Sequence, residues 1–287
     1  MTKVTQVTAR AVRVPLSKVT RQSTRTLDKR EYVIVRVEAE DAGHVGVGYT
    51  YAGTSGGRLV AAAIEDILAP ALLGHDAEGI LASWDRLYQE ALMLERRGLA
   101  IRALSGIDIA LRDLSAKRAG MPLAVLLGGV AKTVPAYASG GYYRPDEGSW
   151  TDAVVAEIRL NRSLGFRDHK IKVGGLSVKE DSARVSAAAD AIGVDGRLAI
   201  DANNAYSSVR DALRAIRAFE EAAGALGLCG WKSHCHRTTS KAIALSRAKS
   251  KHQSRRVQYI RRAGIFDSSS SARPLISYSP TWRSSAE

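Results

Sequence analysis

Two short stretches, His169-Lys-Ile-Lys-Val173 and Leu198-Ala-Ile-Asp-Ala202, combine β-branched or other apolar residues with charged side chains at positions that would share one face of a strand. Successive side chains of a strand point to opposite faces of a sheet. Lys170 and Lys172 therefore share one face of the first strand, and Asp201 lies on one face of the second. The apolar residues between them predict that the other face of each strand packs against helices.

A repeating order of strand and helix surrounds these two stretches. Strands are predicted at 134–138, 169–173 and 198–202, and helices at 151–164, 178–192 and 209–223. Alternating strands and helices are typical of a parallel sheet, either open or closed into a barrel. In a barrel, the charged faces would look inward at the carboxyl ends of the strands, where barrel active sites lie.

Residues 1–131 instead predict an α+β domain. Residues 32–38 and 44–48 alternate as two strands of a hairpin, and the apolar stripe from Ile101 to Leu114 predicts a helix over 100–118. Residues 17–30 are polar and basic, which predicts a mobile loop.

The charged strand faces have two possible interpretations, a catalytic and metal-binding site or a sheet edge that faces solvent. Two crowded lysines lower each other's pKa, which favours a proton acceptor near neutral pH. A carboxylate at Asp201 with an amide at Asn203 suits an oxygen-seeking cation such as Mg²⁺. In the plain reading the sheet is open and its polar strand ends face water.

Three segments resemble one known family. They are Lys170-Ile-Lys172, Asp201-Ala-Asn203 and the stretch Ser105-Gly-Ile-Asp-Ile-Ala-Leu-Arg-Asp-Leu-Ser-Ala-Lys-Arg-Ala-Gly-Met-Pro-Leu-Ala-Val-Leu-Leu-Gly-Gly129. They are similar to the second-strand and third-strand motifs, and to the domain junction, of the mandelate racemase and muconate lactonizing enzymes of the enolase superfamily. The resemblance covers residues 1 to about 226.

The resemblance implies an α/β fold, with an α+β capping domain at 1–131 followed by part of a modified (β/α) TIM-type barrel at 132–228. Only the first three βα units of the barrel are expected. It also implies a racemase or a dehydratase, hence an isomerase or a lyase, that removes the proton α to a carboxylate. Lys172 would be the base and Lys170 its charged assistant. Asp201 would be the first Mg²⁺ ligand, and Asn203 would support the metal or bind substrate.

The resemblance further implies a small hydroxy acid or sugar acid as substrate, and an intact relative would be a homo-oligomer. The polar loop at 17–30 would form part of a lid. The apolar fraction of 45% predicts a globular chain, and no apolar run is long enough for a membrane span. The first residues lack the apolar core of a secretory signal, so we expect a cytoplasmic protein.

The charge of the chain divides unevenly. Residues 1–228 carry a net charge of +3, whereas residues 229–287 carry +10, with thirteen serines and no periodicity. This basic tail lacks the Glu-Glu-Pro that the family has on its fourth strand. Cys229, His234, Cys235 and His236 lack a second organised pair, so we expect no zinc site. The tail has no recognisable nucleic-acid-binding module either, so we expect no specific nucleic-acid partner.

The genetic code explains the tail. If each codon is read one base earlier, the last base of the Trp231 codon joins the first two bases of the Lys232 codon and spells GAA, which is glutamate. In the same frame, the codons of Lys232, Ser233 and His234 permit a second glutamate and then a proline. Residues 253–257, 259–267 and 276–282 permit strings that resemble the family's later strands in the right order. We infer a frameshift between about Leu226 and Gly230. In the shifted frame Gln258 still cannot give the glutamate expected on the fifth strand.

Two hypotheses follow for the chain as written. In the first, it descends from a racemase or dehydratase and is inactive, because the later metal ligands and the second acid/base group are missing. In the second, it is a non-catalytic basic binding protein that reuses the capping domain and half a barrel, with the tail contacting nucleic acid. The restored family-like strings favour the first hypothesis.

Overall fold

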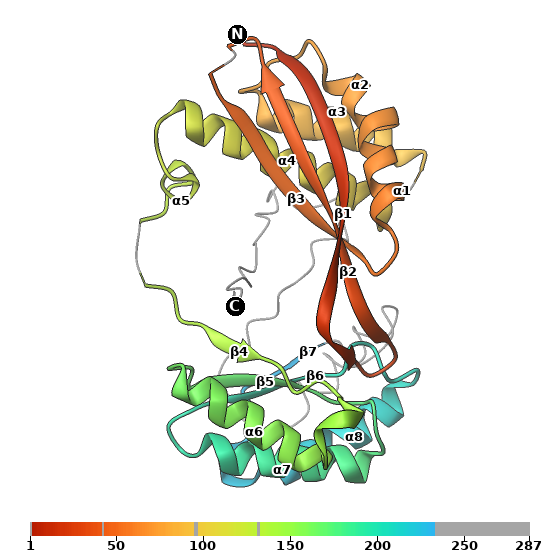
Figure 1. The fold of residues 1–287 in the computed structure, drawn as a ribbon, viewed down its shortest axis with the longest axis vertical. Coiled ribbons are helices and arrows are strands. Elements are labelled where there is room, and N and C mark those ends of the chain that lie inside the picture. Colours follow the sequence, from red (N-terminus) through yellow and green to blue (C-terminus); the bar gives the residue numbers. More distant parts are fainter. Residues whose placement is uncertain (1, 42, 95–96, 131–132, 233–287) are drawn as a thin grey trace, which may run out of the picture.

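The computed structural model describes residues 2–232 except residues 42, 95–96 and 131–132, and this part of the chain forms two sheets, each with its own helices (Figure 1). A three-stranded antiparallel sheet lies at one end of the molecule and a four-stranded parallel sheet at the other. No helix in this part is long and apolar enough to cross a membrane. All of the predicted basic tail after residue 232 lies outside the described residues.

The antiparallel sheet has the order β1-β2-β3. Its strands are Val4–Arg21, Thr26–Ala39 and Val45–Gly53. The predicted hairpin is formed by β2 and β3, in which Val35 pairs with Gly48. Val35 is fully buried, because alternate residues of β2 face the helices.

The prediction of a loop over residues 17–30 is wrong. β1 and β2 continue through most of this stretch as a long hairpin that reaches toward the parallel sheet (Figure 1). Pairing resumes after an irregularity between Pro15 and Thr20. Ser23 and Leu27 are buried, and the Ser23 hydroxyl donates to the carbonyl of Val173 at 2.7 Å. Contacts with a distant part of the chain therefore order a stretch that looks like a loop in the sequence.

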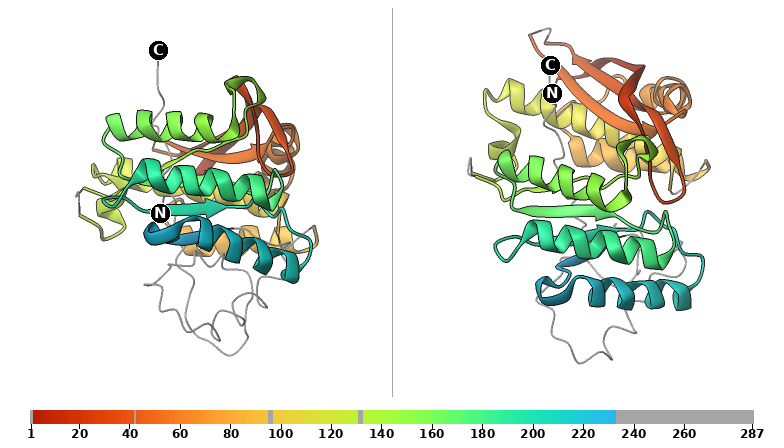
Figure 2. Two further views of the ribbon diagram at one scale, coloured as in Figure 1. Left: turned by 90° about the horizontal axis from the view of Figure 1, so that it is seen from below. Right: turned by 60° about the horizontal axis from the view of Figure 1, so that its bottom comes forward.

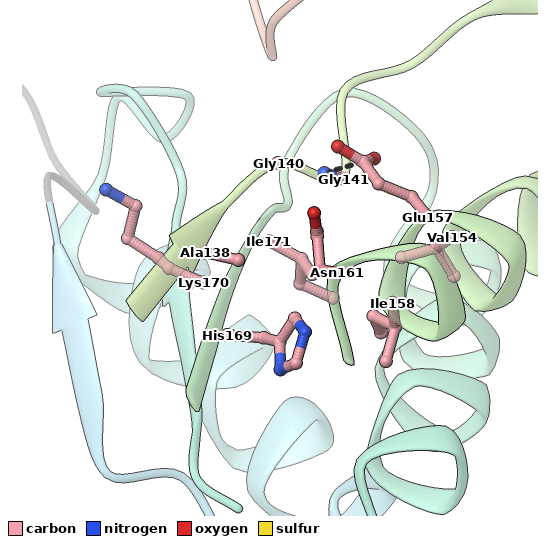
Figure 3. Close-up of a pocket in the computed structure, with 10 residues that line it drawn as sticks. All are labelled: Ala138, Gly140, Gly141, Val154, Glu157, Ile158, Asn161, His169, Lys170 and Ile171. Carbon is pink, nitrogen blue, oxygen red and sulfur yellow. Dashed lines mark hydrogen bonds between the residues drawn. The ribbon is translucent and has the colours of Figure 1, made fainter. Parts of the chain in front are cut away.

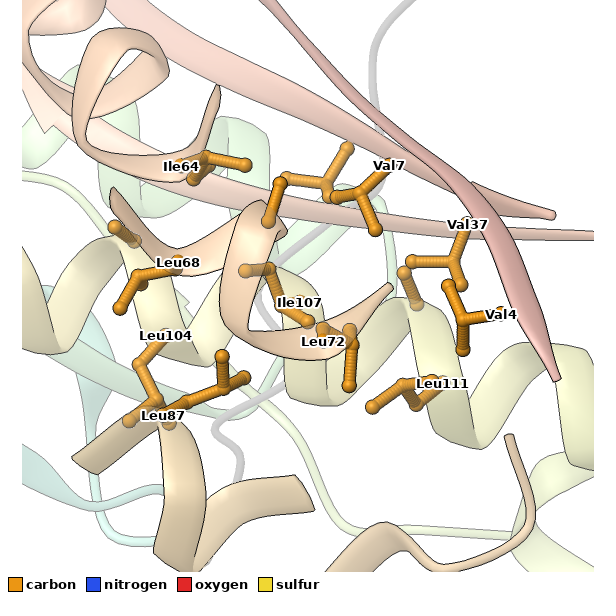
Figure 4. Close-up of a cluster of buried hydrophobic side chains, with 14 of the residues drawn as sticks. Val4, Val7, Val37, Ile64, Leu68, Leu72, Leu87, Leu104, Ile107 and Leu111 are labelled. Carbon is orange, nitrogen blue, oxygen red and sulfur yellow. The ribbon is translucent and has the colours of Figure 1, made fainter. Parts of the chain in front are cut away.

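The helices of this half pack on one face of the antiparallel sheet. They are α1 (Gly57–Ala62), a π-helical turn (Ala63–Leu68), α2 (Ala69–Leu72), α3 (Ile80–Leu92) and α4 (Leu99–Arg118), with a short α5 (Leu123–Leu126) beyond them. Leu104, Ile107 and Leu111 of the predicted stripe point into the shared core (Figure 4). These three side chains meet Val37 of the sheet and Leu68 of the π-helical turn in that core.

Gly46 and Gly48 let β3 approach α4 closely, and a Cβ atom at Gly46 would clash with the carbonyl of Ala110. A Cβ atom at Gly48 would clash with the carbonyl of Gly106 and lie 2.7 Å from the amide nitrogen of Ala110.

We expect Gly48→Ala to lower the free energy of unfolding by about 1–3 kcal/mol, as overpacking does in other cores. Chemical denaturation measures this. Gly43→Ala is the control, since its nearest atom would be 3.9 Å away; equal losses in both variants would contradict the prediction.

The parallel sheet has the order β4-β5-β6-β7. In chain order its elements are β4 (Tyr137–Ser139), a 3₁₀ turn (Pro145–Glu147), α6 (Trp150–Ser163), β5 (Asp168–Lys172), α7 (Val178–Ile192), β6 (Leu198–Asp201), α8 (Val209–Ala222), a 3₁₀ turn (Gly224–Leu226) and β7 (Gly230–Lys232). A serine caps each long helix by accepting the backbone N–H three residues later. Helices α6, α7 and α8 lie side by side and cover one face of the sheet (Figure 2).

The sequence predicts three strands for the parallel sheet, and the structure shows a fourth that the prediction missed. Gly230–Lys232 forms a fourth strand parallel to β6. The backbone N–H of Ala202 donates to the carbonyl of Lys232 at 3.1 Å, and Trp231 packs against the core under the sheet. The strand forms because the edge of β6 supplies unpaired backbone groups, although residues 230–232 show no strand periodicity of their own.

Candidate active site

Three neighbouring strands bring charged side chains to the carboxyl end of the parallel sheet. Lys172 of β5, Asp201 of β6 and Lys232 of β7 lie in register across the sheet. Lys170 lies one pleat earlier on the same face of β5. The pattern of the sequence predicts this face for Lys170, Lys172 and Asp201, but it does not predict Lys232 as a site residue.

Asp201 is the centre of the cluster. Its Oδ2 atom accepts from the ammonium of Lys172 at 2.9 Å and from that of Lys232 at 3.0 Å. Its Oδ1 atom accepts the backbone N–H of Asn203 at 3.0 Å. Burial by itself raises the pKa of this carboxyl group, but the charges of Lys172 and Lys232 outweigh burial and hold the pKa below its ordinary value. Asp201 is therefore a buried, ionised carboxylate held by two cations.

Asn203 contacts Asp201 through its backbone N–H, whereas its side-chain oxygen makes no hydrogen bond to the described residues. The residue has a φ of 47°, a left-handed conformation that asparagine tolerates better than most residues. This turn aims its N–H at Asp201, and its buried Oδ1 atom has no hydrogen-bond partner among the described residues. The structure thus places Asn203 beside Asp201, as predicted, with an amide oxygen available nearby.

Lys170 differs from Lys172 in its partners. Its ammonium lies 3.4 Å from the hydroxyl of Tyr137 and 5.0 Å from the centre of that ring. Burial, together with the nearby charge of Lys172, lowers the pKa of Lys170 to about 8. This is the effect that two crowded lysines predict, and the structure locates it at Lys170.

The depressed pKa has a consequence for stability. Above its ordinary pKa of 10.5, Lys170 is neutral in both the folded and the unfolded chain. Below pH 10.5 Lys170 is protonated in the unfolded chain but still neutral in the folded one. The free energy of unfolding therefore falls as the pH is lowered toward about 8, where the folded chain also becomes protonated, and it is constant below that pH. We expect Lys170→Met to stabilise the fold more at pH 7 than at pH 10 in urea unfolding. Lys3→Met controls for loss of an exposed lysine, and a pH-independent gain would contradict the prediction.

A buried ion pair beneath β5 holds the end of the strand. Arg184 of α7 is 1% exposed and donates to Asp181 at 2.8 Å, to the carbonyl of Lys172 at 2.8 Å and to that of Gly141 at 2.7 Å. The hydroxyl of Tyr143 also donates to Asp181 at 2.8 Å. This network fixes the backbone at Lys172. The sequence does not predict this network, because Asp181 and Arg184 look like an ordinary surface pair three residues apart on a helix.

The β1–β2 hairpin contacts the loops beside the cluster. Arg21 donates to the carbonyl of Gly175 at 2.8 Å and exchanges backbone hydrogen bonds with Tyr143. The neighbouring Tyr142 places its ring 5.4 Å from the ammonium of Lys172. The antiparallel half of the chain therefore contacts the loops that follow β4 and β5, next to the charged strand ends.

The described residues on the other face of β5 leave little room for a substrate. Figure 3 shows His169 and Ile171 pointing toward α6, on the side of the strand opposite Lys170. The cavity there measures about 10 Å³, close to the room that one water molecule needs. His169 is buried, and burial lowers its pKa. This residue therefore belongs to the core of the parallel half.

The described residues do not fit a magnesium ion at this place. Mg²⁺ binds oxygen ligands, usually carboxylates and water, in an octahedral arrangement. Asp201 is the only carboxylate among the strand-end residues described, and the same part of the chain holds no group of three or more potential metal ligands. Both Asp201 oxygens are already engaged, one of them by two ammonium groups.

Two domain families match the sequence. The mandelate racemase / muconate lactonizing enzyme N-terminal domain matches residues 4–128, and the enolase C-terminal domain-like family matches residues 153–226. Arabinonate dehydratase of Saccharolobus solfataricus is 40% identical over 178 residues, which cover 62% of this chain and 46% of the relative. L-talarate/galactarate dehydratase of Salmonella typhimurium is 35% identical over 190 residues, or 66% and 46% of the two chains.

Solved structures agree with these matches. The crystal structure of the Salmonella typhimurium dehydratase aligns with a TM-score of 0.76 at 27% identity, covering 87% of this chain and 62% of that one. A racemase from Streptomyces coelicolor with bound magnesium aligns with a TM-score of 0.71 at 33% identity, covering 81% and 63%. The chain spans about half the length of the curated relatives it matches.

Proposed function

Because the chain belongs to the mandelate racemase and muconate lactonizing enzyme family of the enolase superfamily, we propose that its lineage removes the proton α to the carboxylate of a sugar acid or hydroxy acid. The reaction class is a Mg²⁺-dependent racemisation or dehydration. One observation carries the proposal: Lys172 of β5 lies 2.9 Å from Asp201 of the neighbouring parallel strand β6, and Lys170 lies on the same face of β5.

Each residue has a proposed role in that lineage. Lys172 is the base, since a lysine base is characteristic of the superfamily. Lys170 assists it with positive charge, Asp201 is the first metal ligand, and Asn203 supports Asp201 or binds substrate. The names of the relatives support a sugar acid as the substrate, since an arabinonate dehydratase and an L-talarate/galactarate dehydratase are among them.

We propose further that the chain as written does not perform this reaction. Lys232 of β7 lies opposite Asp201 and pairs with it. We infer that this lysine occupies the position of the first glutamate in the family's Glu-Glu-Pro motif. A frameshift near Leu226 to Gly230 accounts for this, because the shifted frame turns the Trp231–Lys232 codons into glutamate. The domains at 1–131 and 132–228 would then be the original capping domain and the start of its barrel, and residues 229–287 an out-of-frame tail.

Sequencing the source gene across codons 220–235 tests the frameshift, and proton exchange tests the lack of activity. We expect a one-base difference from an in-frame relative between codons 226 and 230. In D₂O with Mg²⁺, we expect no exchange of the α-proton of galactarate or arabinonate, followed by proton NMR. Mg²⁺-dependent exchange that Lys172→Ala abolishes would show that the chain as written is an active enzyme.

A further inference from the structure

The strand ends carry more positive than negative charge. Lys172 and Lys232 both pair with Asp201, and Lys170 lies on the same face of β5 as Lys172, so these four groups have a net charge of +2 when all are ionised. Lys170 forms no ion pair with any carboxylate of the described residues, and its polar contact is the hydroxyl of Tyr137. Such a cluster attracts anions and repels a divalent cation.

The hydrogen bonds of the cluster leave donors for a ligand. An ammonium group has three N–H donors, and Lys232 uses one of them on Asp201 at 3.0 Å. The Lys232 side chain is 54% exposed, so its other donors face solvent. Asp201 keeps this ammonium at the end of β7, in register with Lys172 on β5. The geometry thus fixes a positive charge at the strand ends without a metal ion.

We propose that Lys232 takes the place of a divalent cation in the chain as written, and that Lys170, Lys172 and Lys232 form a metal-independent site for a small carboxylate anion. Charge-assisted hydrogen bonds from ammonium to carboxylate are among the stronger ones in proteins. The bound carboxylate would supply the negative charge that Asp201 alone does not. Binding needs no proton transfer, so this site can exist in a chain that has no turnover.

Calorimetric titration of the full chain with galactarate tests the site directly. We expect the same dissociation constant in EDTA and in Mg²⁺, and we expect Mn²⁺ added alone to show no bound species by electron paramagnetic resonance. Galactarate binding that requires Mg²⁺, or no galactarate binding by a chain with native circular dichroism, would overturn the proposal.

Variants at the exposed end of the cluster locate the site. Lys232→Gln should weaken galactarate binding about tenfold or more, the usual cost of losing one charge-assisted hydrogen bond. Lys3→Gln removes the same charge from an exposed residue at the far end of the antiparallel sheet and should leave binding unchanged. Lys232→Glu should abolish galactarate binding, because it replaces a cation at the site by an anion. Equal affinities for Lys232→Gln and Lys3→Gln would place the anion elsewhere and reject the proposal.

Discussion

Replacing Arg184 with methionine is expected to lower the free energy of unfolding by about 3–5 kcal/mol, the usual cost of removing one partner of a buried ion pair. Arg184 and Asp181 are 1% and 0% exposed, so the substitution leaves a carboxylate in the core without its cation. It also removes the donors to the carbonyls of Lys172 and Gly141, which are then left unsatisfied. The methionine restores volume but no hydrogen bond.

Urea unfolding followed by circular dichroism measures this loss. Arg159→Met on the exposed side of α6 is the matched control, because it makes the same chemical change at a solvent-facing position. We expect the control to change stability by less than about 0.5 kcal/mol, as surface substitutions usually do. A similar small change for Arg184→Met would show that the network does not support the parallel half of the fold.

The sequence predicts elements well where their periodicity reflects their own packing. The stripe containing Leu104, Ile107 and Leu111 predicts α4, since those residues face the core that the helix shares with the sheet. The alternation around Lys172 and Asp201 likewise predicts which faces of β5 and β6 carry charge. In both cases the local pattern and the burial in the fold agree.

The sequence fails where distant contacts decide the structure. The polar stretch at 17–30 becomes a hairpin because its end packs on the loops after β4 and β5, as the hydrogen bond from Ser23 to Val173 shows. β7 forms at the edge of β6, and this places Lys232 beside Asp201. No local pattern encodes either contact. The role of Arg184 is hidden in the same way, because only the fold brings the carbonyl of Lys172 to it.

A chain read in the restored frame is expected to gain Mg²⁺-dependent exchange of the α-proton. Correcting one base between codons 226 and 230 replaces the cation of Lys232 by a carboxylate that faces Asp201. Gln258 does not become glutamate in that frame, so the test chain also carries a glutamate at the codon spanning Val257 and Gln258. Adjacent carboxylates provide oxygen ligands that Mg²⁺ accepts, whereas the chain as written offers one carboxylate and two ammonium groups.

Lys172→Ala in that restored chain should then reduce exchange about 10²–10⁴-fold, the usual contribution of a positioned general base. Alanine cannot accept a proton, while Asp201 and the rest of the sheet edge stay in place. Lys3→Ala in the same chain is the control and should exchange at the parent rate. Lys172 is 4% exposed and paired with Asp201, so the fold of the variant must be verified by its melting curve. Exchange that survives Lys172→Ala in a folded protein would assign the base to another residue, and Lys170 is then the first to replace, because its pKa of about 8 already suits a proton acceptor.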